Sequence, residues 1–268
     1  MKAGKRKYNF NFILGSIITC IMILFVLIGM IHTPYDPDVM SATLKNTGPT
    51  FSHPFGTDNF GRDILSRVMK GAGTTFLIAV ITVTIGATLG TIIGAFTGYF
   101  GGWVDEILMR INDGLTSFPS ILLALVFVSI FGKGTYNIIL ALGIIFTPSF
   151  ARIIRSEYII LKEMDFVKNA KLIGAGNLRI IFIHILPNTK QIMLPSLLIA
   201  FNNAVLAEAG MSYLGLGVQP PHASLGRMLS EAQTYLLNAP WYAIAPGLTI
   251  VFTVLGISLI SGGVAHEA

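Results

Sequence analysis

The chain has 268 residues, of which 53% are hydrophobic and only 12% charged, and its net charge is +5. A soluble domain carries about twice that charged fraction, so the excess apolar residues must face lipid rather than water. The basic residues lie between apolar runs, which argues for a place beside a membrane rather than for nucleic-acid binding. A single cysteine, Cys20, excludes an intrachain disulfide.

The N-terminus combines a basic start with a long apolar run. Residues 1–7 include four Lys or Arg, and residues 10–31 are predominantly apolar. A cleaved signal peptide has the same order of features, but its apolar part is shorter and a small-x-small cleavage site follows it. Here the run reaches the roughly 20 residues that cross a bilayer, and no such site follows. We therefore predict an uncleaved first transmembrane helix.

Five further apolar stretches predict an all-α membrane protein with six transmembrane helices. The third and fourth stretches are short and close together, so we expect a hairpin that turns at Gly132-Lys133-Gly134. No phosphate-binding loop, zinc-ligand pair or nucleophile elbow occurs in the sequence. The five predicted stretches are residues 74–99, 117–131, 136–151, 191–212 and 241–261.

The distribution of Lys and Arg predicts the orientation of these helices. With both termini in the cytoplasm, the cytoplasmic segments hold twelve of these residues and the outer segments hold six. Basic residues concentrate on the cytoplasmic side of membrane proteins. We therefore expect cytoplasmic N- and C-termini and a cytoplasmic loop at residues 154–190.

That loop is a polar stretch whose pattern predicts two short helices. Asp165 is a suitable cap for a first helix, in which Phe166, Ala170 and Ile173 form one apolar face. Gly174 ends this helix, because glycine tolerates the backbone angles that a sharp reversal requires.

A second helical segment follows the glycine. Asn177 is a suitable cap for residues 178–186, and Pro187 is expected to end them. Two such helices on a membrane face have little to bury against within their own chain. We therefore interpret them as a docking surface for another protein. The alternative is an amphipathic helix that lies on lipid headgroups.

The first outer segment, residues 32–73, contains a compact polar motif. Two of its glycines permit tight turns, and we expect Asp58, Arg62 and Asp63 to pair and to fix the lead into the second span. The motif comprises Gly56, Thr57, Asp58, Gly61, Arg62 and Asp63.

The second span carries Gly86, Gly90, Gly94 and Gly98, which recur at intervals of four residues. They stack on one helical stripe and allow a neighbouring helix to approach closely, so we expect helix packing there. Such a flat face would also let helices slide during gating. A local ion-pair set near the membrane surface is expected after this span, made of Asp105, Arg110 and Asp113.

The fifth span contains Asn202, Asn203 and Glu208. Polar and ionisable groups inside a span are costly and face the bundle interior or a water-filled path. One hypothesis is that these residues line a translocation path. The other is that the two amides only join helices by hydrogen bonds. For Glu208, near the outer end, structural pairing is the favoured hypothesis.

Three strings in this order resemble the C-type permease subunits of the ATP-binding-cassette importers for dipeptides, oligopeptides and nickel. The first string is Gly56-Thr57-Asp58 with Gly61-Arg62-Asp63 and Ser66-Arg67. The second is Ala170, Gly174 and Ile185-Leu186-Pro187, and the third runs from Glu208-Ala209 to Pro220-Pro221. The chain departs from that pattern at Lys168, Gly73 and Leu225, where the family usually has an acid, an arginine and a tryptophan, and in its short C-terminus.

The resemblance implies a type I importer permease fold in the cytoplasmic membrane. Residues 1–73 would form an anchor helix and an extracytoplasmic segment, and residues 74–262 the permease domain. The implied partners are a second, homologous permease, two ATPase subunits, an extracytoplasmic substrate-binding protein and the lipid bilayer. ATP would bind to the ATPase subunits, and this chain would hold no cofactor or metal. The outer motif would then serve either as an anchor or as a lid and contact for the binding protein.

The resemblance also implies roles within the 154–190 loop, which would dock on an ATPase and transmit its motion to the spans by alternating access. The cargo would be dipeptides or oligopeptides, or alternatively nickel or a metal–chelator complex. The coupling residues implied are Asp165, Lys168, Ala170, Lys171, Ile173, Gly174 and Pro187.

Two other classes of protein are weaker interpretations. An ion-coupled secondary transporter often carries repeated halves, but the sequence has no internal repeat and Glu208 is its one clearly intramembrane acid. An intramembrane enzyme would need a catalytic pair inside the spans, whereas the five histidines fall in loops or at ends. We therefore expect a transport subunit without enzymatic activity of its own.

Overall fold

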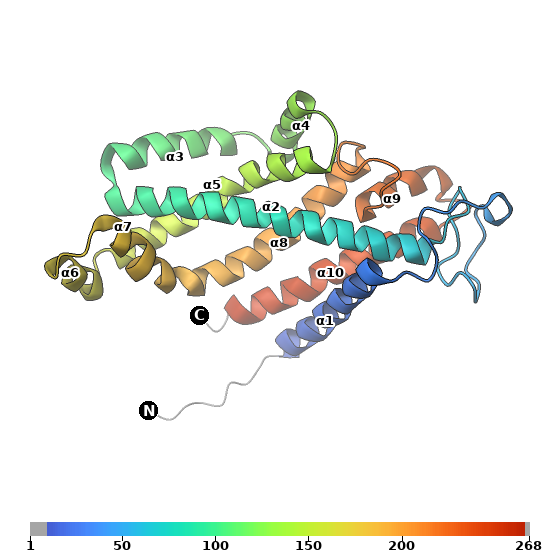
Figure 1. Cartoon of the computed structure of the whole chain (residues 1–268), viewed down its shortest axis with the longest axis horizontal. Helices are drawn as coiled ribbons and strands as arrows, with labels where there is room; N and C mark the ends of the chain where they lie inside the picture. Colours follow the sequence, from blue (N-terminus) through green and yellow to red (C-terminus); the bar gives the residue numbers. More distant parts are fainter. Residues whose placement is uncertain (1–9, 266–268) are drawn as a thin grey trace.

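The computed structural model describes residues 10–265, and within them the regular structure is helical (Figure 1). Five helices there are long and apolar enough to cross a membrane, or six if α3 and α4 together count as one broken span. The five long helices are α1 (Phe10–Ile31), α2 (Ile64–Phe100), α5 (Thr135–Leu161), α8 (Lys190–Tyr213) and α10 (Trp241–Ala265). The shorter ones are α3 (Gly102–Thr116), α4 (Ser120–Phe131), α6 (Asp165–Leu172), α7 (Asn177–Arg179) and α9 (Leu225–Ala232).

The bundle is elongated and has two distinct ends (Figure 1). Helices α6 and α7 form one end, which we call the α6 end. Residues 32–63 and α9 form the other, which we call the α9 end. The described ends of α1 and α10, at residues 10 and 265, both point toward the α6 end.

The second span begins at Ile64 and not at residue 74, so this predicted boundary was wrong. Asp63 caps the helix, because its carboxylate accepts a hydrogen bond from the Ser66 backbone N–H at 2.8 Å. The apolar pattern starts later because the first helical turns carry the charged Arg67, which is fully buried among polar partners at the α9 end.

The third span also differs from the prediction of a helix over residues 117–131. Helix α4 has only 12 residues, and α3 precedes it at an angle of 92° across a short break that ends at Pro119. The predicted turn between the third and fourth spans is present, with positive φ at Gly132 and Gly134. Helix α5 continues to Leu161 instead of ending at residue 151.

The predicted local ion-pair set after the second span is wrong, because its members pair with other residues. Asp105 binds Arg155 at 2.5 Å, and Asp113 lies 3.4 Å from Arg152, both on α5. The third member pairs within α3: Arg110 binds Glu106 at 3.1 Å. The short Asp105–Arg155 contact fastens α3 to α5, and the Asp113–Arg152 contact between the same helices is longer.

The glycine stripe of α2 packs against α5, as predicted. A Cβ atom added at Gly90 would lie 2.5 Å from the Cβ of Phe150, and one added at Gly98 would lie 2.6 Å from the Cβ of Tyr158. The other two glycines of the stripe meet α5 equally closely. The absence of side chains therefore lets the two backbones approach closely between Gly86 and Gly98 of α2.

Candidate functional site

Helix α6 forms the tip of the α6 end, and its buried face differs from the predicted one. Of the predicted face only Ala170 is buried, together with Val167, whereas Ile173 is 84% exposed and Phe166 is 39% exposed. The cap residue is Met164 rather than Asp165, whose carboxylate lies exposed in the first turn. The helix packs by Val167 and Ala170, which are three positions apart. Phe166 and Ile173 therefore fall on its outer side and stay exposed.

Gly174 ends α6 as predicted. Its φ is +85°, and the Ala175 backbone N–H returns to the Ala170 carbonyl at 3.0 Å. The basic residues on α6 make loose contacts: the Lys171 ammonium lies 5.5 Å from the centre of the Tyr99 ring, and Lys168 lies 4.0 Å from Asp165.

The second segment of the loop is longer than predicted and continuous with α8. Asn177 does not cap it, because its side-chain oxygen instead accepts a hydrogen bond from the Tyr99 hydroxyl at 2.9 Å. Pro187 does not end it either. It stands near the start of the short 3-10 turn Leu186–Thr189, and the helical path continues through it into α8. The π-helical stretch Ile180–Ile185 precedes this turn.

The loop buries a core of its own, contrary to the expectation that it has little to pack against. Ile180, Ile181 and Ile185 are fully buried with Tyr158 of α5 and Ala95 of α2. The Tyr158 hydroxyl also donates a hydrogen bond to the Ile181 carbonyl at 3.0 Å. The α6 end is therefore packed against α2 and α5 through a shared buried core.

A hollow of about 650 Å³ lies between α4, α5 and α8. Most of its lining is apolar, with amide and hydroxyl groups contributed by Asn203, Ser120 and Ser149. Asn202 does not line it, since its side-chain N–H group donates to the Val254 carbonyl of α10 at 3.2 Å. The two neighbouring amides thus face different surroundings.

Glu208 lies outside the hollow and is fully buried. Its carboxylate accepts a hydrogen bond from the Ser212 hydroxyl at 2.6 Å, and that hydroxyl accepts one from the Val218 backbone N–H at 3.1 Å. This contact joins α8 to the segment that leads to α9, so the geometry is that of structural pairing.

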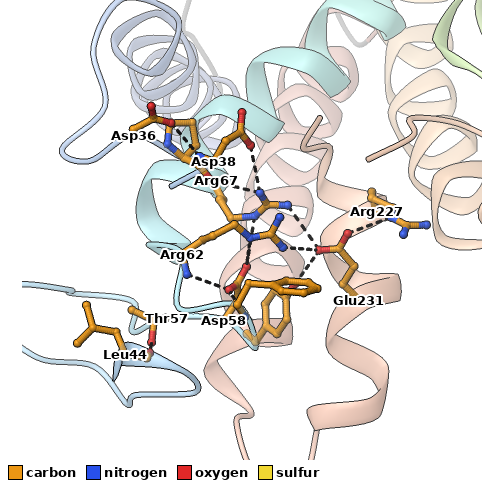
Figure 2. A network of polar contacts seen from close by, with 12 residues as sticks. Asp36, Asp38, Leu44, Thr57, Asp58, Arg62, Arg67, Arg227 and Glu231 are labelled. Carbon is orange, nitrogen blue, oxygen red and sulfur yellow. Dashed lines mark hydrogen bonds and ion pairs between the residues drawn. The ribbon is translucent and has the colours of Figure 1, made fainter. Parts of the chain in front are cut away.

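The polar motif at the α9 end forms a connected network (Figure 2). Asp58 accepts hydrogen bonds from the Arg62 backbone at 2.9 Å and from its guanidinium at 2.6 Å. Arg62 also reaches Glu231 of α9 at 3.1 Å. Burial alone would lower the pKa of Arg62, but the carboxylates of Asp58 and Glu231 outweigh it and raise that pKa. The predicted pairing of Asp58 with Arg62 is confirmed.

The rest of the motif holds the lead into α2. Asp63 caps α2 and contacts His53 at 2.9 Å. The expectation that it pairs with Asp58 and Arg62 was therefore wrong. Thr57 is buried and donates a hydrogen bond to the Leu44 carbonyl. Gly56 and Gly61 have φ values of +72° and +76°, which suit the predicted turns.

Glu231 is the centre of the network, and sequence patterns did not single it out. Its carboxylate contacts Arg62, Arg67 at 3.5 Å, the Tyr242 hydroxyl at 2.8 Å and Arg227 at 3.1 Å. Burial works against its ionisation, but the hydrogen bond from Tyr242 and the charges of the arginines outweigh it and lower the pKa of Glu231. The one local sign is the i, i+4 spacing from Arg227, which says nothing of the distant partners.

Comparison with known proteins identifies the family to which this chain belongs. Residues 90–266 match the family model described as "Binding-protein-dependent transport system inner membrane component". The chain belongs to this family. It is the permease subunit of an ATP-binding-cassette importer and a multi-pass protein of the inner membrane, and the resemblance seen in the sequence is confirmed.

Relatives of this permease include the glutathione transport system permease protein GsiD. The protein of that name from Escherichia coli O6:K15:H31 is 38% identical over 250 residues, 93% of this chain and 82% of that one. The Salmonella paratyphi A protein is 42% identical over 243 residues, 90% and 80% of the two chains. The family component is the membrane permease and not the ATPase.

The fold of the permease is similar to that of a solved importer. An inward-facing structure of the MetNI methionine ABC transporter superposes with a TM-score of 0.58 at 17% identity, covering 75% of this chain and 95% of that one. At this identity the likeness concerns the fold alone.

Proposed function

We propose that this permease forms one half of a translocation path for small peptides and is driven by an ATPase subunit that docks on the α6 end. The single observation that carries the docking is an apolar pair at the tip of α6. Leu172 and Ile173 are 85% and 84% exposed. Exposed apolar side chains beside a glycine-terminated helix are suited to a groove on another protein.

The α6 end lies in the cytoplasm in this proposal, together with both termini. The excess of Lys and Arg in the segments of that side supports the orientation. Two ATPase subunits bind ATP there, while a second permease completes the path and an extracytoplasmic binding protein meets the α9 end. The permease itself contributes no cofactor, metal or nucleic-acid site.

Small peptides are the proposed cargo. The names of the relatives refer to glutathione, which is a tripeptide. The hollow between α4, α5 and α8 offers amide and hydroxyl groups in an apolar lining, and its volume lies within the roughly 300–1,000 Å³ of small-molecule sites. Asn203 lines the path in this proposal, whereas Asn202 and Glu208 hold helices together.

The docking is tested by replacing the apolar pair in the complete transporter. Leu172→Asp with Ile173→Asp should abolish copurification of the ATPase and ATP-driven uptake into proteoliposomes, because two carboxylates would have to be desolvated in the groove. Phe51→Asp, a fully exposed residue at the α9 end, is the matched control and should retain the ATPase. Normal copurification and uptake in the double variant would refute the docking.

The cargo is tested in the same proteoliposomes with radioactive glutathione, dialanine and nickel. ATP-dependent uptake of a peptide supports the proposal. Uptake of nickel alone would instead indicate that the permease belongs to a metal importer. Peptide uptake that a protonophore abolishes at constant ATP would indicate an ion-coupled transporter.

A further inference from the structure

A charged pair, Arg152 and Asp113, lies beside the lining of the hollow on the side of the α6 end, and we call it the rim. Phe146 and Ser149 of α5 line the hollow, and Arg152 follows on the same stripe of the helix, one turn nearer the α6 end. Across from it, Ser120 lines the hollow at the start of α4, just after the bend from α3. Arg152 spans the two sides by donating to the Thr116 hydroxyl of α3.

Asp113 completes this rim. Its carboxylate lies 3.4 Å from the Arg152 guanidinium, and the two side chains are 67% and 47% exposed. A pair this exposed contributes little free energy, so a ligand can open it at small cost. The pair therefore offers one positive and one negative group, in contact, next to the lining of the hollow.

The neighbouring pair on the same helices is built differently. Arg155 donates two hydrogen bonds to Asp105, at 2.5 and 2.6 Å, and these side chains are only 34% and 21% exposed. Two short bonds fasten α3 to α5 without help from Arg152 and Asp113. The looser pair is thus free for another role.

We propose that Arg152 and Asp113 bind an amino-acid head group, in which the ammonium and the carboxylate stand on one carbon, as in a γ-glutamyl peptide. The ligand carboxylate takes the place of Asp113 on Arg152, and the ligand ammonium takes the place of Arg152 on Asp113. The remainder of the peptide occupies the hollow against Asn203, Ser120 and Ser149. This inference rests on the proposed peptide transport and names its substrate class.

Charge spacing is what gives the site its selectivity. A γ-linked peptide such as glutathione keeps both charges of its glutamyl head on one carbon, which matches two protein groups in contact. In its α-linked isomer the carboxylate nearest the ammonium is that of the glutamyl side chain, which two methylene groups separate from the carbon bearing the ammonium, so it fits two groups in contact less well. One of its charges then lies farther from its protein partner and gains less Coulomb energy, so the α-linked isomer binds more weakly.

A cysteine-labelling experiment tests this in the purified complete transporter without ATP. The variant Cys20→Ser removes the single native cysteine, and Ser149→Cys places a thiol in the hollow. The rate of alkylation by N-ethylmaleimide is measured with S-methylglutathione or with its α-linked isomer. S-Methylglutathione should protect the thiol, and the isomer should protect it about tenfold less well, the cost of one charged contact.

Variants of the rim identify the groups. Arg152→Gln and Asp113→Asn should each weaken protection about tenfold, and the exchanged pair Arg152→Asp with Asp113→Arg should recover part of it. Arg110→Gln, in an exposed pair on α3 away from the hollow, is the control and should behave as the parent. Retained ATPase copurification verifies that each variant is folded.

Two results would overturn the inference: equal protection by the two isomers, or unchanged protection in the Arg152→Gln and Asp113→Asn variants. If the wild-type transporter still imports peptides in either case, the proposed function stands and the head-group site is wrong. If the wild-type transporter imports no peptide of any kind, both are wrong.

Discussion

Arg62 and Glu231 lie 169 positions apart in the chain, yet the Arg62 guanidinium and the Glu231 carboxylate are 3.1 Å apart (Figure 2). The contact joins the segment before α2 to α9, and the Tyr242 hydroxyl extends it to α10. Arg67, fully buried in α2, shares the same carboxylate. One acidic side chain thus holds the second span, the last span and α9 in a fixed arrangement.

Glu231→Gln should destabilise the permease by about 3 kcal/mol, because it removes one partner from a buried ionic network and leaves arginine charge uncompensated. The measurement is thermal unfolding of the detergent-solubilised protein. Glu106→Gln is the matched control: its partner Arg110 is 79% exposed, so the cost should stay below about 1 kcal/mol. Equal stability of the two variants would contradict the central role of Glu231.

The lowered pKa of Glu231 makes this network sensitive to acid. The folded protein holds the carboxylate ionised below the ordinary glutamate pKa of about 4.3, so its contribution is complete above that pH. The contribution is lost as the pH falls through the lower folded pKa. The difference in stability between wild type and Glu231→Gln should therefore shrink as the pH is lowered below about 4. A difference that stayed constant would show that ionisation of Glu231 is not what stabilises the network.

Gly90→Ala should destabilise the contact between α2 and α5. The added methyl would lie 2.5 Å from the Phe150 Cβ and 2.6 Å from the Thr147 carbonyl oxygen, an overpacking that costs about 1–3 kcal/mol. Gly114→Ala is the control, since it lies in α3 with open space around it and should stabilise that helix by up to about 1 kcal/mol. Thermal unfolding compares the two, and a stable Gly90→Ala variant would mean that the helices can move apart freely.

Local patterns were sufficient for the features that depend on one segment. The bounds of α1, the glycine stripe of α2 and the glycine that ends α6 follow from apolar runs, spacing and backbone freedom. The start of α2 did not, because Arg67 looks unsuited to a buried helix until its partners on other segments are known.

The candidate site shows the same division. The motif around Asp58 and Arg62 is visible in the sequence, but Glu231 is not, since only the folded chain brings it to the arginines. Likewise, spacing alone assigned the apolar face of α6 to Phe166, Ala170 and Ile173, of which only Ala170 is buried. The buried residues are Val167 and Ala170, because the core supplied by Ile180 and Ile181 meets the other side of the helix.

Gly174→Val should weaken the docking of the ATPase and thereby ATP-driven transport. A β-branched residue is strained at a φ of +85°, so the end of α6 must rearrange and displace the exposed Leu172 and Ile173. ATPase copurification and ATP-driven uptake in proteoliposomes should both fall, whereas the stability of the transmembrane bundle should change little. Gly176→Val is the matched control, because Gly176 also has open space but an ordinary φ of −69°. It should behave as wild type, and equal behaviour of the two valine variants would refute a role for the bend at Gly174 in docking.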